Sequence, residues 1–148
     1  MLPYRYKIAT GGRYGPAMAR ETVEREMEEL LGTVPSVLNR VPDELVEAEW
    51  QRFKRTQFGE TMIPNRYKEL IGVAVAAALR CPYGLRLHTE LARLYGATDA
   101  EVAEAVHFTG LVVGWSTQMT GLGPDPADFA AEVDKTVGHL ARTMGLAE

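Results

Sequence analysis

The chain has a single cysteine, Cys81, among its 148 residues. One thiol cannot form a disulfide within the chain, so the small secreted scaffolds that disulfides stabilise are excluded. A lone cysteine fits a protein of the reducing cytoplasm, or a thiol that is kept for its reactivity. We therefore expect a cytoplasmic location, and Cys81 is the first candidate for a functional group.

Excess charge of either sign is also missing. The net charge is -4 and the pI is about 5.5, which gives no reason to expect a nucleic acid as partner. The first residues, 1–6, lack the apolar core of a signal peptide. The longest uncharged run, Ala105 to Pro124, contains His107, Gln118 and several glycines and hydroxyls. This run predicts a buried helix with His107 in the core, and no membrane partner.

No stretch shows the alternation of apolar and polar residues that a half-buried strand needs. Apolar residues instead recur at helical spacing, and glycine or proline separates the segments. Residues 1–18 predict an irregular N-terminal arm, and residues 19–148 a single domain of the all-α class with about six helices. These helices are expected over residues 19–31, 44–58, 64–80, 82–95, 98–120 and 127–144. Asp43 is a plausible N-cap, and Thr98 with Glu101 resembles a capping box.

Cys81 is followed by Pro82, and His88 lies seven residues further on. Proline is favoured at the first position of a helix, which predicts Cys81 as the N-cap. There the free backbone N–H groups and the helix dipole favour the thiolate. His88 lies within about 20° of Cys81 around the helix axis and roughly 10 Å along it. The two residues therefore share a face, but only longer side chains or a water could bridge them.

Glu69 lies twelve residues before Cys81, at the head of an apolar run. A carboxylate in such a run is costly unless it is paired or protonated. If the helices before and after Cys81 pack as an antiparallel hairpin, Glu69 faces His88. It could then orient the imidazole or relay a proton toward the sulfur.

Each of these residues also has a purely structural interpretation. Cys81 could be a small buried apolar residue, and His88 a cap or a surface residue. Glu69 could form an ion pair with one of its basic neighbours, which are Arg66, Lys68, Arg80 and Arg93. The three candidates are spread more widely than the ligands of most zinc sites, so we predict no metal and no other cofactor.

The segment from Glu69 to His88 resembles the signature of the alkylhydroperoxidase D-like, carboxymuconolactone decarboxylase-like superfamily. That signature is a glutamate, eleven residues, Cys-x-x-Cys, three residues and a histidine. Glu69, Cys81 and His88 match in type and spacing, but Gly84 occupies the place of the second cysteine. The segments 31–38 and 96–102 also resemble the family, so that the resemblance covers roughly residues 19 to 121.

The resemblance implies an all-helical, homo-oligomeric protein. In the redox branch of the family the thiol pair reduces hydroperoxides or a partner protein, and the glutamate and histidine relay protons. The second cysteine is usually taken as the one that attacks the peroxide, and here it falls on Gly84. No disulfide can form between positions 81 and 84, so Cys81 would have to take over the attack.

Three hypotheses follow. Our first expectation is an antioxidant, peroxidase-type enzyme. In this enzyme a peroxide oxidises Cys81 and an external thiol reductant restores it. Glu69 and His88 relay protons for the reaction. The second is a decarboxylase-like acid–base enzyme that uses His88 and Glu69 on a cyclic or carboxylated substrate. The third is a non-catalytic oligomeric relative. Broad apolar faces and the long uncharged helix predict a homo-oligomer in each case.

Overall fold

The computed structural model describes residues 18–146, and all regular structure in that range is helical. This confirms the prediction of an all-α fold with about six helices. The predicted N-terminal arm lies outside the described residues, except for Met18. The elements are α1 (Arg20–Leu31), the short 3₁₀ helix η1 (Leu38–Arg40), α2 (Asp43–Gln57), α3 (Asn65–Ala78), α4 (Pro82–Leu94), α5 (Asp99–Leu122) and α6 (Pro126–Thr143).

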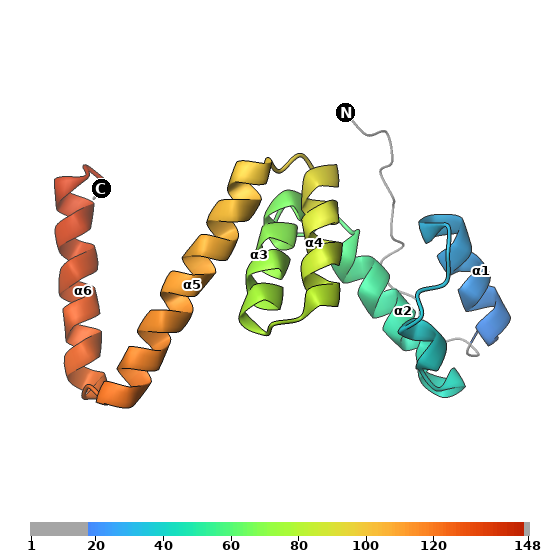
Figure 1. Cartoon of the computed structure of the whole chain (residues 1–148), viewed down its shortest axis with the longest axis horizontal. Coiled ribbons are helices and arrows are strands. Elements are labelled where there is room, and N and C mark those ends of the chain that lie inside the picture. Colours follow the sequence, from blue (N-terminus) through green and yellow to red (C-terminus); the bar gives the residue numbers. More distant parts are fainter. Residues whose placement is uncertain (1–17, 147–148) are drawn as a thin grey trace.

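The helices follow one another along an elongated molecule (Figure 1). α3 and α4 lie side by side at the centre, α1 and α2 form one end, and α6 lies at the other. α3 packs against both α4 and α5, so it occupies the middle of the molecule as its apolar sequence predicted. The α3–α4 pair is therefore the frame on which the other helices are arranged.

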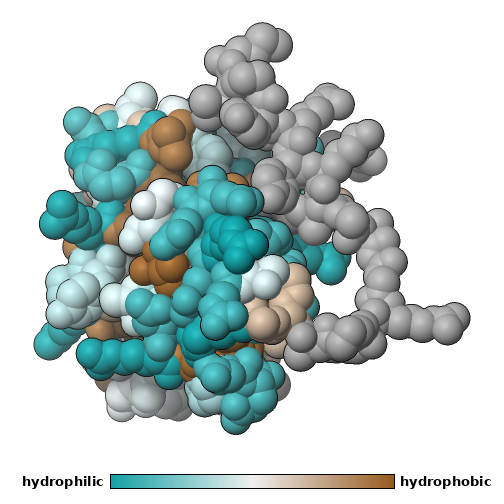
Figure 2. Space-filling view, turned by 90° about the vertical axis from the view of Figure 1, so that its right-hand side faces the viewer, coloured by the Kyte–Doolittle hydropathy of each residue, from teal (hydrophilic) through white to brown (hydrophobic). Residues whose placement is uncertain are grey.

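The first packed region lies between α1, η1 and α2. Its buried core centres on Trp50 and Met27, with Val23, Val46 and Leu38 around them. The indole N–H of Trp50 donates to Glu26 Oε2 at 2.6 Å, which provides the polar partner that a buried tryptophan needs. Figure 2 looks onto this end of the molecule, where hydrophilic surface predominates over apolar patches.

The second packed region lies between α3, α4 and the turn into α5. Val73 and Ala76 of α3 are buried there, together with Ala92 and Ala97. Three of these four side chains are alanine methyl groups. Small residues at a helix contact allow the two backbones to approach closely, which places α3 and α4 near enough for polar side chains to meet.

Two predictions about helix starts had different outcomes. The capping box at the start of α5 is confirmed, because the side chains of Thr98 and Glu101 each accept from the other residue's backbone N–H. The prediction of Asp43 as an N-cap is wrong by one residue. Pro42 is the N-cap of α2, since its carbonyl already accepts from Leu45 and Val46. Asp43 is the first helical residue, where its negative charge suits the helix dipole.

The expectation that the uncharged run forms a buried helix is wrong for this chain, because α5 contains no buried residue. α5 has 24 residues and α3 has 14, so at 1.5 Å per residue α5 is about 15 Å longer than the helix it packs against. Its distal part leaves the α3–α4 pair and turns back into α6 (Figure 1). His107, in the first half of α5, is exposed rather than in the core.

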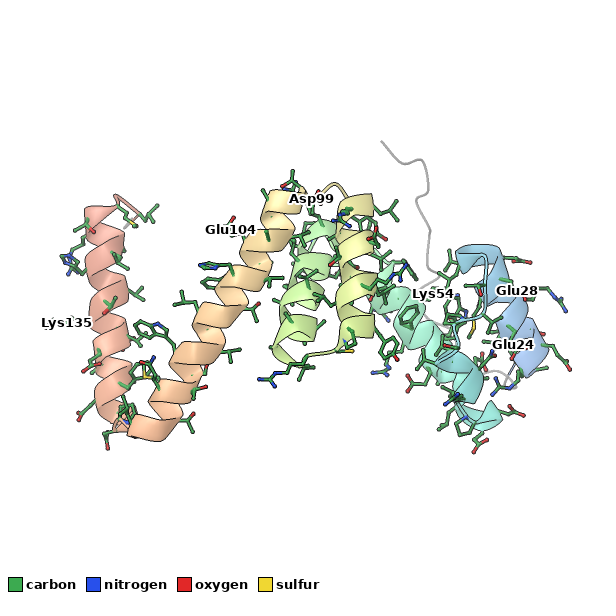
Figure 3. The ribbon with its side chains drawn as sticks, viewed as in Figure 1. Glu24, Glu28, Lys54, Asp99, Glu104 and Lys135 are labelled. Carbon is green, nitrogen blue, oxygen red and sulfur yellow. The ribbon has the colours of Figure 1, made fainter. Side chains whose placement is uncertain are left out.

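Apolar side chains are therefore exposed along α5 and α6. Phe108 is 61% exposed and Trp115 is 58% exposed. Figure 3 labels Glu104 on α5, the last charged residue before Asp125, and Lys135 on the side of α6 away from α5. An apolar groove lies between the two helices, lined by Leu111, Val112, Trp115, Ser116, Met119, Thr120 and Phe129. Across residues 18–146, no helix is both long and apolar enough to span a membrane.

Candidate functional site

Glu69 and His88 meet between α3 and α4. The antiparallel hairpin brings His88 Nδ1 to 2.8 Å from Glu69 Oε2. The Glu69 side chain is 1% exposed and that of His88 is 25% exposed, so the pair has a buried end and an accessible end. The predicted juxtaposition is confirmed. Within residues 18–146, Glu69 has no ion pair with an arginine or lysine, the structural alternative raised by the sequence.

The contact has a defined chemical consequence. An ionised carboxylate only accepts hydrogen bonds, so its contact with His88 requires the imidazole proton to be on Nδ1. Nε2 of the neutral ring is then left to accept a proton. The second carboxylate oxygen, Oε1, accepts from Nε2 of Gln57 at 2.6 Å. Both oxygens of the buried carboxylate therefore have partners, as burial of a charge requires.

Gly72 lies against the imidazole ring of His88. A Cβ added at Gly72 would be 2.4 Å from Nδ1 and 2.5 Å from Cγ of the ring, far inside van der Waals contact. Only a residue without a side chain lets the ring occupy this place. Neither Gly72 nor Gln57 was predicted from the sequence as part of this site. Gly72 carried a signal, since a glycine inside an apolar helix often has a packing reason, whereas nothing in the spacing singled out Gln57.

Cys81 is the N-cap of α4, as its position before Pro82 predicted. Its sulfur accepts a hydrogen bond from the backbone N–H of Gly84, at 3.4 Å. The thiol is partly buried and free. Among the described residues no hydrogen bond joins its sulfur to His88 or Glu69. The structure thus brings together two of the three predicted site residues and places the thiol apart from them, at the start of the same helix.

The turn that positions Cys81 is tight. Arg80 has φ = 53°, in the left-handed region that glycine occupies at lower cost. This conformation costs a non-glycine residue roughly 1–2 kcal/mol. The N–H of Cys81 then donates to the carbonyl of Ala76 at 2.9 Å, which closes the end of α3. α3 therefore ends and α4 begins within a few residues, and Cys81 is held at a fixed point of that turn.

Gly84 stands one helical turn after Cys81. A Cβ added there would be 3.8 Å from Cβ of Cys81 and 3.2 Å from Cβ of Ala76. Disulfides have a mean Cβ–Cβ distance of about 3.8 Å. Position 84 therefore has the spacing of a disulfide partner of Cys81, although the chain has a glycine there.

The negative charge of Glu69 affects the pKa of two neighbouring groups, Lys68 and Tyr95. Burial lowers the pKa of Lys68, and the nearby negative charge of Glu69 partly opposes this. Burial also raises the pKa of Tyr95, Glu69 raises it further, and the side chain of Asn65 opposes both effects. Tyr95 is therefore a neutral phenol near the buried carboxylate at physiological pH. In the described part of the chain, no cluster of three or more His, Cys, Asp or Glu could hold a metal ion.

Replacing Gly72 with alanine tests the packing of the site. The added methyl group must displace the His88 ring, which breaks its contact with Glu69 and leaves a buried carboxylate oxygen without that partner. We expect Gly72→Ala to lower the free energy of unfolding by about 1–3 kcal/mol, measured by urea denaturation. Gly138→Ala is the matched control, because its Cβ would only touch Arg142 at 3.5 Å. Equal stabilities of the two variants would contradict the packing described here.

Comparisons with known proteins agree with this fold. Residues 44–124, more than half of the chain, match the model of the carboxymuconolactone decarboxylase family. An alkyl hydroperoxide reductase of Mycobacterium tuberculosis is 36% identical over 93 residues, which are 62% of this chain and 26% of that protein. The chain thus spans about a quarter of the length of that relative.

Two crystal structures are similar. The alkylhydroperoxidase AhpD core of Rhodospirillum rubrum has a TM-score of 0.62 and 26% identity, over 74% of this chain and 85% of the other. A putative carboxymuconolactone decarboxylase of Burkholderia xenovorans shares the fold, with a TM-score of 0.53 and 23% identity over 80% of this chain and 93% of the other. From the family match and these likenesses, the chain belongs to the carboxymuconolactone decarboxylase family.

Proposed function

We propose that the protein is a one-cysteine, thiol-dependent peroxidase that reduces hydroperoxides and is restored by an external thiol. The observation that carries the proposal is the position of Cys81 at the N-terminus of α4, where a backbone N–H already donates to its sulfur. Backbone N–H groups at a helix N-terminus stabilise negative charge, and the thiolate is the nucleophilic form of cysteine. The relatives named for alkyl hydroperoxide reduction support the same activity.

The reaction balances with one cysteine. The Cys81 thiolate attacks the terminal oxygen of a hydroperoxide, the O–O bond breaks, and the departing alkoxide takes a proton to become an alcohol. The sulfur, oxidised to a sulfenic acid, is attacked by an external thiol, which forms a mixed disulfide and releases water. A second thiol molecule attacks the mixed disulfide, restores Cys81 and leaves as the oxidised reductant. Such a reductant is available in the cytoplasm, where we place the protein.

We propose that the Glu69–His88 pair transfers the proton in this reaction. Glu69 holds the proton of the imidazole on Nδ1, so that Nε2 can take a proton from the thiol and return it to the alkoxide. His88 and Cys81 share one face of α4 but no hydrogen bond joins them, so a water or the substrate itself has to bridge them. His88 is partly exposed, which leaves room for such a bridge.

Single-turnover kinetics test this function. Alkyl hydroperoxide consumption by the reduced protein should be lost in Cys81→Ser and should fall by about 10²-fold in His88→Ala, the lower range for removal of a general acid–base group. Mass spectrometry should show one added oxygen atom on the wild-type protein. His139→Ala is the control, because this histidine is exposed on α6 and should not affect the rate. Peroxide consumption that survives Cys81→Ser would refute a thiol mechanism.

A second candidate function is acid–base catalysis on a cyclic or carboxylated substrate. The observation that favours it is the completeness of the Glu69–His88 pair without any contribution from the thiol. Turnover of such a substrate that survives Cys81→Ser but is lost in His88→Ala would select this function over the peroxidase. An absence of both activities would leave the non-catalytic oligomeric relative as the remaining hypothesis.

Restoring the second cysteine should change the redox behaviour of the protein. In Gly84→Cys the new Cβ would be at disulfide distance from Cβ of Cys81, so we expect peroxide to produce an intramolecular disulfide instead of a lasting sulfenic acid. Thiol titration should then find no free thiol after oxidation and two after reduction. Arg86→Cys adds a thiol at an exposed position of the same helix and serves as control. Two free thiols in oxidised Gly84→Cys would contradict the geometry.

We also propose that α5 and α6 associate with a second copy of the chain. No charged residue lies between Glu104 and Asp125, and exposed apolar side chains line the groove between the two helices. A charged partner surface would be desolvated there without compensation. The chain itself carries further exposed apolar side chains, including Ile71 and Val75 of α3. Burial between copies would remove these faces from water.

Light scattering at micromolar concentration tests this association. The wild-type protein should have at least twice the mass of one chain, and Trp115→Glu should shift it to the monomer because a charge would be buried at the contact. Met62→Glu places the same charge on a side chain that is almost fully exposed, outside α5 and α6, and should leave the mass unchanged. A monomeric wild-type protein would overturn the proposal.

A further inference from the structure

The buried carboxylate of Glu69 has one hydrogen-bond partner from outside the α3–α4 pair. Gln57, the last residue of α2, donates from Nε2 to Glu69 Oε1 at 2.6 Å, while His88 Nδ1 contacts Oε2 at 2.8 Å. Glu69 is almost completely buried, so water does not replace a missing donor easily. The amide of Gln57 therefore shares with His88 the task of holding this carboxylate.

From this arrangement we propose that Gln57 is a positioning residue for His88, acting through Glu69. Two donors on two different oxygens fix the plane of the carboxylate, and this keeps Oε2 directed at Nδ1 of the imidazole. The imidazole proton is thereby held on Nδ1, and Nε2 stays available on the accessible side. The expected effect of Gln57 on the reaction rate rests on the proposed function, whereas its expected effect on the His88 tautomer does not.

A merely structural role for Gln57 would be to attach α2 to α3. Other contacts already do this. Lys68 Nζ donates to the carbonyls of Thr56 at 3.1 Å and Gly59 at 2.9 Å, and Asn65 Nδ2 donates to the carbonyl of Phe58 at 3.4 Å. Three hydrogen bonds besides that of Gln57 thus join the end of α2, and the two residues after it, to α3. Loss of the Gln57 amide should leave α2 in place while it frees one oxygen of Glu69.

The test is the tautomer of His88 in Gln57→Met, a variant of similar size and shape without a donor. Long-range ¹H–¹⁵N spectra distinguish an Nδ1–H from an Nε2–H imidazole. The other two histidines of the chain, His107 and His139, are exposed and act as internal references. In the wild-type protein His88 should be the Nδ1–H form. In Gln57→Met its pattern should move toward that of the two exposed histidines.

Gln51→Met is the matched control. Gln51 is also a partly buried glutamine of α2, and no hydrogen bond links it to Glu69. The control should leave the His88 tautomer unchanged. If Gln57→Met does not fold, as judged by circular dichroism, Gln57→Leu removes the same donor with another apolar side chain and adds no carboxyl group. This variant should also shift His88 away from the Nδ1–H tautomer. An Nδ1–H His88 in whichever variant folds would overturn the proposal.

The kinetic readout separates this proposal from the proposed function. With an active wild-type protein, peroxide consumption by Gln57→Met should fall about tenfold, the lower range for loss of a residue that orients a functional histidine. An unchanged rate would overturn the positioning role. If the wild-type protein does not consume peroxide at all, the proposed function fails, and the His88 tautomer alone decides whether Gln57 positions the imidazole.

Discussion

The carboxylate of Glu69 is the group on which the arrangement of the central helices depends. Taking an ionised carboxylate out of water costs several kcal/mol unless donors replace the lost hydration. Here the replacements come from two helices, an amide at the end of α2 and an imidazole in the middle of α4. α2, α3 and α4 must therefore all be in place before the charge is compensated. The partners of this carboxylate thus depend on the docking of α2 as well as on the α3–α4 hairpin.

The thiol has a different physical basis. Cys81 depends on the backbone, through the N-terminus of α4 and the tight turn at Arg80, rather than on the buried pair. A sulfur held by backbone groups keeps its surroundings when a distant side chain changes. The pair and the thiol can therefore be altered separately, which is what makes the peroxidase and the acid–base hypotheses distinguishable. Because residue 84 is a glycine, the sulfur of Cys81 lies beside a position without a side chain instead of a second thiol.

The features that the sequence predicted are those set by local spacing. Glu69 and His88 could be paired because a short turn at Cys81 forces an antiparallel hairpin, and Thr98 could be assigned because a capping box is local. Gln57 could not be found in this way, since its role depends on how α2 docks on α3. The same holds for His107, whose exposure depends on how α5 docks on α3. Features that depend on contacts between distant helices could not be predicted from the periodicity of the sequence.

In the proposed peroxidase reaction, the missing second cysteine changes which step depends on access to solvent. With two thiols in one chain, the disulfide forms internally and the reductant only has to reach a finished bond. With Cys81 alone, the external thiol has to reach the oxidised sulfur itself. The start of α4 permits this approach, because Pro82 and Tyr83 are both exposed while Cys81 is only partly buried. If α5 and α6 bury their apolar faces against α3 of a second copy, that contact has to leave the turn after α3 uncovered for the external thiol to reach Cys81.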